Sequence, residues 1–142
     1  MSSNSDIVNC SIQNAFISAT DYQCVGALCG QSESDSFENV TVDASIRLHT
    51  NNTEDENAPH YQLISGACGM LTGTYTGQML TAFVNSKASG HITDENSYFS
   101  VGGLCGKAES MIYMTNCTNS TEISSAGIAG GLVGSAATVS YT

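Results

Sequence analysis

The feature that most constrains the fold of this chain is a glycine-rich segment of six residues that recurs four times. Its pattern is a β-former or small residue, Gly, a small residue, Leu or Ala, Cys or Val, and Gly, with slight drift in the second copy. Successive copies begin 39, 37 and 28 residues apart, which indicates an internal repeat. The copies occupy residues 25–30, 64–69, 101–106 and 129–134.

A second segment precedes each hexamer and consists of an apolar β-former, one further residue, Asn, and then Cys or a small residue. From this Asn to the hexamer the chain runs 16, 25, 16 and 13 residues. The long gap contains the polar residues 49–60, which we expect to form an inserted loop, because repeat proteins accommodate insertions between their strands. The four asparagines are Asn9, Asn39, Asn85 and Asn116.

These spacings predict a single repeat domain over residues 1–142, with units of approximately 6–36, 37–80, 81–110 and 111–142. Only 11% of the residues are charged and there is one proline. Short alternating segments at 101–105, 111–116 and 121–125 predict three strands in one unit, whereas no segment keeps an apolar period of 3.6 residues. We therefore expect an all-β fold, a short β-solenoid of four Gly-rich repeats whose rungs pair mainly in parallel.

The combination of a Gly-Gly-Leu-Val-Gly hexamer with an Ile/Met-x-Asn-Cys segment resembles the GLUG repeat. Residues 101–106, 114–117 and 130–134 match it best, and the four units together span most of the chain. Ala27, Ala67 and Ser86 depart from the pattern. GLUG repeats occur in tandem in large surface-anchored and secreted proteins, including adhesin-like ones. The resemblance implies a β-helical stalk or surface module, located outside the cell or on its surface, and implies no chemistry.

One unit cannot bury its own apolar face, so neighbouring units should pair about 4.8 Å apart and stack like side chains in rows. The hexamer glycines should either turn the chain with positive φ or let neighbouring backbones approach closely. The fourth hexamer residues are expected to form one inward row: Leu28, Ala67, Leu104 and Leu132. A further row is expected from Ile12, Val42, Ile92 and Ile123.

The fifth hexamer residues are three cysteines and a valine, which marks this position as small and apolar. A free thiol behaves there as a compact hydrophobe. Bridging between neighbouring units remains open, although parallel side chains would have Cβ atoms about 4.8 Å apart, longer than the usual 3.5–4.5 Å of a disulfide. This row contains Cys29, Cys68, Cys105 and Val133.

The charge balance excludes several partners. Thirteen acidic residues face only Arg47, Lys87 and Lys107, giving a net charge of -10. Nucleic acid and anionic lipid both require clustered basic residues, so neither is expected as a partner. No apolar stretch is long enough for membrane insertion, and the first 25 residues lack the pattern of a signal peptide. The chain is therefore expected to be intracellular, or to be a module of a larger or processed exported protein.

Motifs for chemistry are absent from the sequence. There is no CxxC, HExxH, GxSxG, Walker or EF-hand pattern, and the histidines His49, His60 and His91 are scattered. The acidic residues 54–56 fall in the expected loop, where solvation or weak Ca²⁺ capture are the alternatives. We predict no catalytic, cofactor-binding or metal-binding residues, no cofactor, and no enzymatic activity.

Five Asn-x-Ser/Thr sequons occur in the chain. Those at Asn9, Asn39 and Asn116 use the repeated Asn, so the repeat itself accounts for them. Asn51 and Asn119 are the candidate glycosylation sites if the protein is exported in a eukaryote.

Two functions fit this sequence. The first is a structural module that associates with other copies into a fibre, stalk or surface layer, because the segments 6–8 and 135–142 read as strand at both ends and neither end offers a charged lid. The second is a glycan- or ice-binding adhesin module that uses one flat face. Its candidate residues are the threonines Thr72, Thr74 and Thr76 and the tyrosines Tyr61, Tyr75, Tyr98 and Tyr113.

Overall fold

Strands and tight turns make up the fold. The structure, a computed structural model, describes residues 2–3, 6–20, 24–33, 36–49, 62–72, 81–94, 99–125 and 127–141. These residues contain strands but no helix, and every strand pairing among them is parallel. The predicted loop at 49–60 lies outside them, except for His49.

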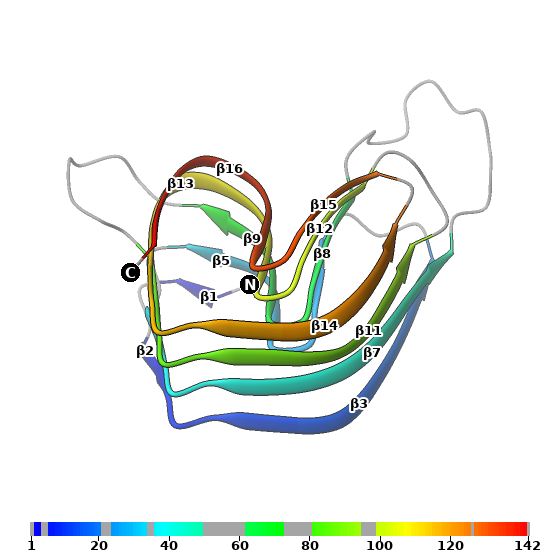
Figure 1. Cartoon of the computed structure of the whole chain (residues 1–142), viewed down its shortest axis with the longest axis horizontal. Coiled ribbons are helices and arrows are strands. Elements are labelled where there is room, and N and C mark those ends of the chain that lie inside the picture. The colour runs from blue at the N-terminus through cyan, green and yellow to red at the C-terminus, as the bar shows by residue number, and fades with distance from the viewer. Residues whose placement is uncertain are drawn as a thin grey trace.

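Three sheets contain all of the described strands (Figure 1). Sheet A consists of β1 (Ser2–Ser3), β2 (Asp6–Val8), β5 (Cys29–Glu33), β6 (Ser36–Glu38), β9 (Cys68–Thr72), β10 (Thr81–Val84), β13 (Cys105–Thr115) and β16 (Val133–Tyr141). Sheet B consists of β3 (Ser11–Thr20), β7 (Thr41–His49), β11 (Lys87–Asp94) and β14 (Thr118–Ser125). Sheet C consists of β4 (Cys24–Gly26), β8 (Gln62–Ser65), β12 (Phe99–Gly102) and β15 (Ile128–Gly130).

The chain runs through these sheets four times in the same order. Each pass starts in sheet A, crosses sheet B, turns into sheet C and returns to sheet A. Equivalent strands of successive passes are neighbours, as in the order β3, β7, β11, β14 of sheet B (Figure 1). Strand β13 combines the end of the third pass with the start of the fourth, because its two halves pair with β9 and β10. This path is compatible with a β-helix.

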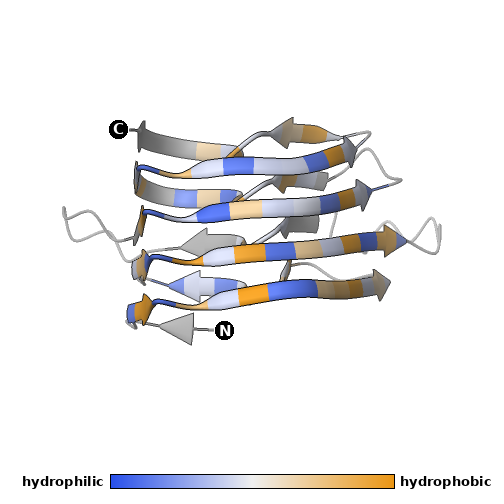
Figure 2. Ribbon diagram, turned by 60° about the horizontal axis from the view of Figure 1, so that its bottom comes forward, coloured by the Kyte–Doolittle hydropathy of each residue, from blue (hydrophilic) through white to orange (hydrophobic). Residues whose placement is uncertain are grey.

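The core lies between the sheets and is most completely buried in the second and third passes. Phe37 and Phe83 pair in register in sheet A, and their stacked rings lie 4.5 Å apart. Ile46 and Ile92 pair in sheet B, and all four side chains are buried. Each such burial stabilises the fold by about 1.5–3 kcal/mol. Hydrophilic and hydrophobic residues recur along the long strands, as Figure 2 shows.

The row predicted from Ile12, Val42, Ile92 and Ile123 is wrong in its register. Ile12 pairs with Val42, and Ile92 pairs with Ile123, but the two pairs lie in different rows. The sheet B strands run for eight to ten residues and carry several inward positions, which sequence spacing did not distinguish. The two rows are Ile12, Val42, Ala88 and Asn119, and Ile17, Ile46, Ile92 and Ile123.

The hexamer forms a turn between two strands, so the strand predicted over 101–105 is interrupted. Gly103 and Leu104 lie in the bend between β12 and β13. A Cβ placed on Gly102 would lie 1.9 Å from the carbonyl oxygen of Cys105, and one on Gly103 would lie 2.3 Å from Cγ of Asn119 in sheet B. These glycines therefore allow close approach of backbones within the turn and of the turn to sheet B.

Gly90 differs from the hexamer glycines because it is the described glycine with a positive φ, at 111°. A Cβ at this position would lie 2.1 Å from the carbonyl oxygen of Ala44 in the neighbouring strand. We expect Gly90→Ala to lower the free energy of unfolding by about 2 kcal/mol or more, because backbone strain and a backbone clash coincide. Urea denaturation followed by circular dichroism would measure the change.

Gly131→Ala is the matched control, because no heavy atom of the described residues, other than its chain neighbours, lies within 4 Å of a Cβ placed there. Its effect should stay within about 0.5 kcal/mol. Equal losses of stability in the two variants would contradict the pairing of β7 with β11.

Candidate functional site

The fifth hexamer residues are aligned across the four passes. Cys29 pairs with Cys68, Cys68 with Cys105, and Cys105 with Val133. Cys68 and Cys105 are fully buried, whereas Cys29 and Val133, at the two ends of the row, are half-buried. None of these cysteines is in a disulfide. The row therefore packs as small apolar side chains do.

Backbone hydrogen bonds run between passes at the fourth hexamer position, and between the second and third passes the donor is Cys68 N, 3.0 Å from the carbonyl oxygen of Leu104. Leu28 N donates to the carbonyl oxygen of Ala67, and Leu104 N donates to that of Leu132, both at 3.0 Å. Ala67 and Leu104 are fully buried, and the leucines at the two ends are half-buried. The structure thus brings all eight predicted row residues into two adjacent rows.

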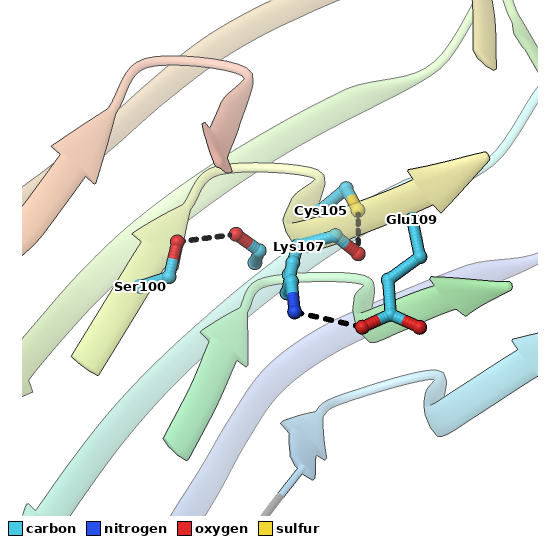
Figure 3. Close-up of polar contacts among 5 residues, drawn as sticks. Ser100, Cys105, Lys107 and Glu109 are labelled. Atoms are coloured by element: carbon cyan, nitrogen blue, oxygen red, sulfur yellow. Dashed lines mark hydrogen bonds and ion pairs between the residues drawn. The ribbon is translucent and has the colours of Figure 1, made fainter. Parts of the chain in front are cut away.

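Polar contacts hold the third hexamer turn and the strand after it (Figure 3). The buried Ser100 hydroxyl donates to the carbonyl oxygen of Gly106 at 2.8 Å, which ties β12 to β13 across the turn. The Cys105 thiol donates to the carbonyl oxygen of Lys107 at 3.2 Å. Lys107 Nζ lies 2.7 Å from Glu109 Oε1, a partly exposed ion pair of small energetic value.

Two thiols outside the hexamer row have raised pKa values. Burial raises the pKa of Cys24, the nearby Glu109 raises it further, and Lys107 opposes the shift. Burial also raises the pKa of Cys117, against backbone hydrogen bonds that lower it. Both thiols are therefore protonated at neutral pH, and they are poor nucleophiles because the thiolate is the reactive form.

The four repeated asparagines form a continuous ladder at the corner between sheets A and B. All of them have φ between 50° and 56°, a left-handed conformation that Asn tolerates better than most residues. Asn39 Nδ2 donates to Asn9 Oδ1 at 2.9 Å, Asn85 Nδ2 to Asn39 Oδ1 at 3.2 Å, and Asn116 Nδ2 to Asn85 Oδ1 at 2.8 Å. The sequence shows these residues as a repeated position, but their role in a ladder was not predicted. The available signal for it was their recurrence at the same point of each unit.

The outer side of this corner is hollowed. A shallow depression of about 500 Å³ lies beside the ladder and offers amides, hydroxyls and one ammonium group to solvent. Such groups can hydrogen-bond a polar ligand. The residues lining it are Asn39, Thr41, Asn85, Lys87, Asn116 and Thr118.

Of the two candidate glycosylation sites, the structure describes only Asn119. Asn51 lies outside the described residues. Asn119 is half-buried, its Oδ1 accepts a hydrogen bond from Thr121 N at 3.1 Å, and its side chain lies against Gly103 of the hexamer turn. A glycan would require this side chain to turn outward, so the placement does not favour glycosylation at Asn119.

The other candidate residues are dispersed. Among the described residues, no group of three or more His, Cys, Asp or Glu side chains could hold a metal ion. His91 Nδ1 lies 3.0 Å from Glu122 Oε2 on the exposed face of sheet B, and His60 lies outside the described residues. Tyr113 is half-buried and Thr72 ends β9. Tyr61, Tyr75, Tyr98, Thr74 and Thr76, and the acidic residues 54–56, lie outside the described residues.

No helix in the described part of the chain is long and apolar enough to cross a membrane.

The inward side chains of sheet B change from apolar to polar along the stack. In register, the first pass contributes Ile12, Ala15, Ile17 and Ala19. The last pass contributes Asn119, Thr121, Ile123 and Ser125 to the same four rows. The sequence predicted no charged lid at either end, yet the fourth pass carries polar groups in three of these rows. In one of them the third pass is polar as well, since the buried Asp94 accepts a hydrogen bond from the Ser125 hydroxyl at 2.7 Å. The two ends of the stack are therefore chemically different.

Comparisons with known protein families, with curated proteins and with solved structures found no match. The resemblance of the hexamer and the Asn segment to the GLUG repeat therefore stays a prediction. The geometry of the described residues is the basis for the function proposed below.

The direction of the hydrogen bonds in the asparagine ladder can be tested by replacing a donor amide with a carboxylate. In Asn85→Asp, the ladder loses the amide that donates to Asn39 Oδ1 and gains a second oxygen facing it. We expect a loss of about 1–2 kcal/mol in the free energy of unfolding. The loss should shrink below about pH 4, where a protonated carboxyl regains a donor.

Asn9→Asp is the matched control. Among the described residues, the Asn9 side chain only accepts a hydrogen bond, from Asn39, and a carboxylate can still accept it. Urea denaturation of both variants at pH 7 and pH 3.5 checks the prediction. Equal losses in the two variants at pH 7 would contradict the ladder.

Proposed function

We propose that this chain is a non-catalytic structural module, a short β-solenoid of four repeats that joins other copies of itself in a fibre, stalk or surface layer. The observation that carries this proposal is that both ends of the stack leave strand edges unpaired within the described residues. These edges belong to β3 and β4 at one end and to β14 and β15 at the other. Unpaired edges are templates for pairing with another chain.

The burial of the rows supports the same role. In the second and third passes the row residues are buried, whereas Ile12 and Ile17 of the first pass and Ile123 and Leu132 of the last remain half-buried. They are incompletely covered because only one neighbouring pass packs on each. Additional passes from another copy would bury them further.

The distribution of repeated side chains also supports a scaffold. Hexamer rows and the asparagine ladder hold one pass to the next, and the side chains that recur in the sequence are those that make these contacts. Resemblance to the GLUG repeat favours the same class of protein and a location outside the cell or on its surface.

A glycan-binding module is the second candidate, and the depression along the asparagine corner favours it. Thr41, Lys87 and Thr118 pair in register, so their outward groups are repeated at about the 4.8 Å strand spacing. Titration with neutral and acidic oligosaccharides, followed by backbone amide chemical shifts, would distinguish this role. Shifts confined to the corner and abolished by Lys87→Ala would support glycan binding.

The structural role predicts self-association that increases with concentration. Sedimentation velocity and negative-stain electron microscopy of the purified chain, from dilute to concentrated, should show species larger than a monomer. A monomer at every concentration would contradict self-association and would favour the glycan-binding candidate.

A further inference from the structure

The first pass of the stack exposes an apolar edge strand without charged residues. Strand β3, at the edge of sheet B, contains no charged residue over its ten positions. Phe16 projects from its outer face with 73% of its surface exposed, and Val8 of β2 is 43% exposed. The long strands nearest the N-terminus also show more hydrophobic colour in Figure 2 than the long strand nearest the C-terminus.

We propose that a second copy of this chain covers the first pass head to head, with the two β3 strands paired about a two-fold axis. Two copies then meet through this end, and a fibre or stalk is built from such pairs. This inference rests on the structural role proposed above and specifies which end carries the contact. A two-fold axis places the two edge strands antiparallel, a pairing that sheets readily adopt.

The opposite end of a second copy is a poorer partner for the first pass. Head-to-tail stacking would bury Asn119 and Thr121 against apolar side chains, whereas the Ser125 hydroxyl is already bonded to Asp94. Thr121 Oγ1 is already buried without a hydrogen-bond partner among the described residues. Each further buried polar group without a partner costs about 1–3 kcal/mol.

Sheet A extends one layer beyond sheets B and C at both ends of the stack, because β1 pairs with β5 next to the first pass. The second half of β16 pairs with Met111–Met114 of β13 and so lies one layer beyond β14 and β15. A copy stacked on this end would contact β16 first. A gap one strand wide would then remain over sheets B and C, and their edges would stay unpaired. In a head-to-head pair the two residues of β1 leave β5, which costs one two-residue pairing per copy and lets the β3 strands meet.

A second copy of this chain is a better partner for the first pass than a different protein, because the two contacting surfaces are then identical and carry little charge. In the described part of the first pass the charged residues are Asp6 and Glu33, so identical ends meet with little repulsion and offer little to a basic partner. The bulge in β3, where Asn14 has a φ of 52°, interrupts regular pairing near the start of the strand only. Residues 15–20 keep a regular register, and a two-fold axis near Phe16 brings the two phenyl rings together.

The experiment transfers the polar end to the first pass. The variant Ile12→Asn, Ala15→Thr, Ala19→Ser carries at each position the residue that the fourth pass holds in the same row. Because these residues fit a terminal pass, the variant should fold, which circular dichroism checks. Sedimentation velocity should show dimers for the unmodified chain and at least a tenfold weaker dimer for the variant.

Two further variants sharpen the test. Phe16→Asp changes one exposed side chain, cannot disturb the core, and should weaken the dimer as well. The variant Asn119→Val, Thr121→Ala, Ser125→Leu places at the far end the residues that the second pass carries in the same rows. It should leave the dimer intact.

The outcomes separate this inference from the structural role on which it rests. Dimers that the first-pass variants weaken, and the far-end variant does not, support it. Filaments that the first-pass variants leave unchanged would preserve the structural role but overturn head-to-head pairing. Dimers insensitive to both first-pass variants would also overturn it, and a monomer at every concentration would overturn both proposals.

Discussion

Parallel pairing of each pass with the next, in a fixed register, is the constraint on which the structure depends. Because strand side chains alternate between faces, a slip of one residue would move Ile46 and Ile92 from the core to solvent. Several contacts oppose such a slip: the stacked rings of Phe37 and Phe83, the left-handed asparagine corner, and the close backbone approach at Gly90. Phe37 and Phe83 lie two residues before the corner asparagines of their passes, so in these two passes the ring stack and the corner align sheets A and B together.

The sequence was most informative where a residue type recurs. The hexamer and the Asn segment recur because every pass needs the same turn and the same corner, and the hexamer rows followed from their alignment. The register of sheet B could not be predicted, since its strands offer several inward positions filled by similar residues and β3 contains a bulge. The polar residues of the last pass were also missed, because Asn119, Thr121 and Ser125 resemble the Ser, Thr and Asn found throughout the chain.

The chemical difference between the two ends links this fold to a function. Inner passes bury their apolar rows against neighbours on both sides, whereas a terminal pass has one neighbour. In the fourth pass, polar inward residues reduce the apolar surface left open. The first pass keeps apolar inward residues and an uncharged edge strand. Exposed apolar surface destabilises an isolated chain, but it stabilises an interface when another chain covers it.

The account depends on parallel passes joined at the asparagine corner, and nuclear Overhauser contacts between side-chain amides test this most directly. The account predicts cross-peaks from Asn39 to Asn9, from Asn85 to Asn39 and from Asn116 to Asn85, with none between Asn9 and Asn116. Absence of these contacts, together with backbone contacts between strands consecutive in sequence as in antiparallel hairpins, would contradict it.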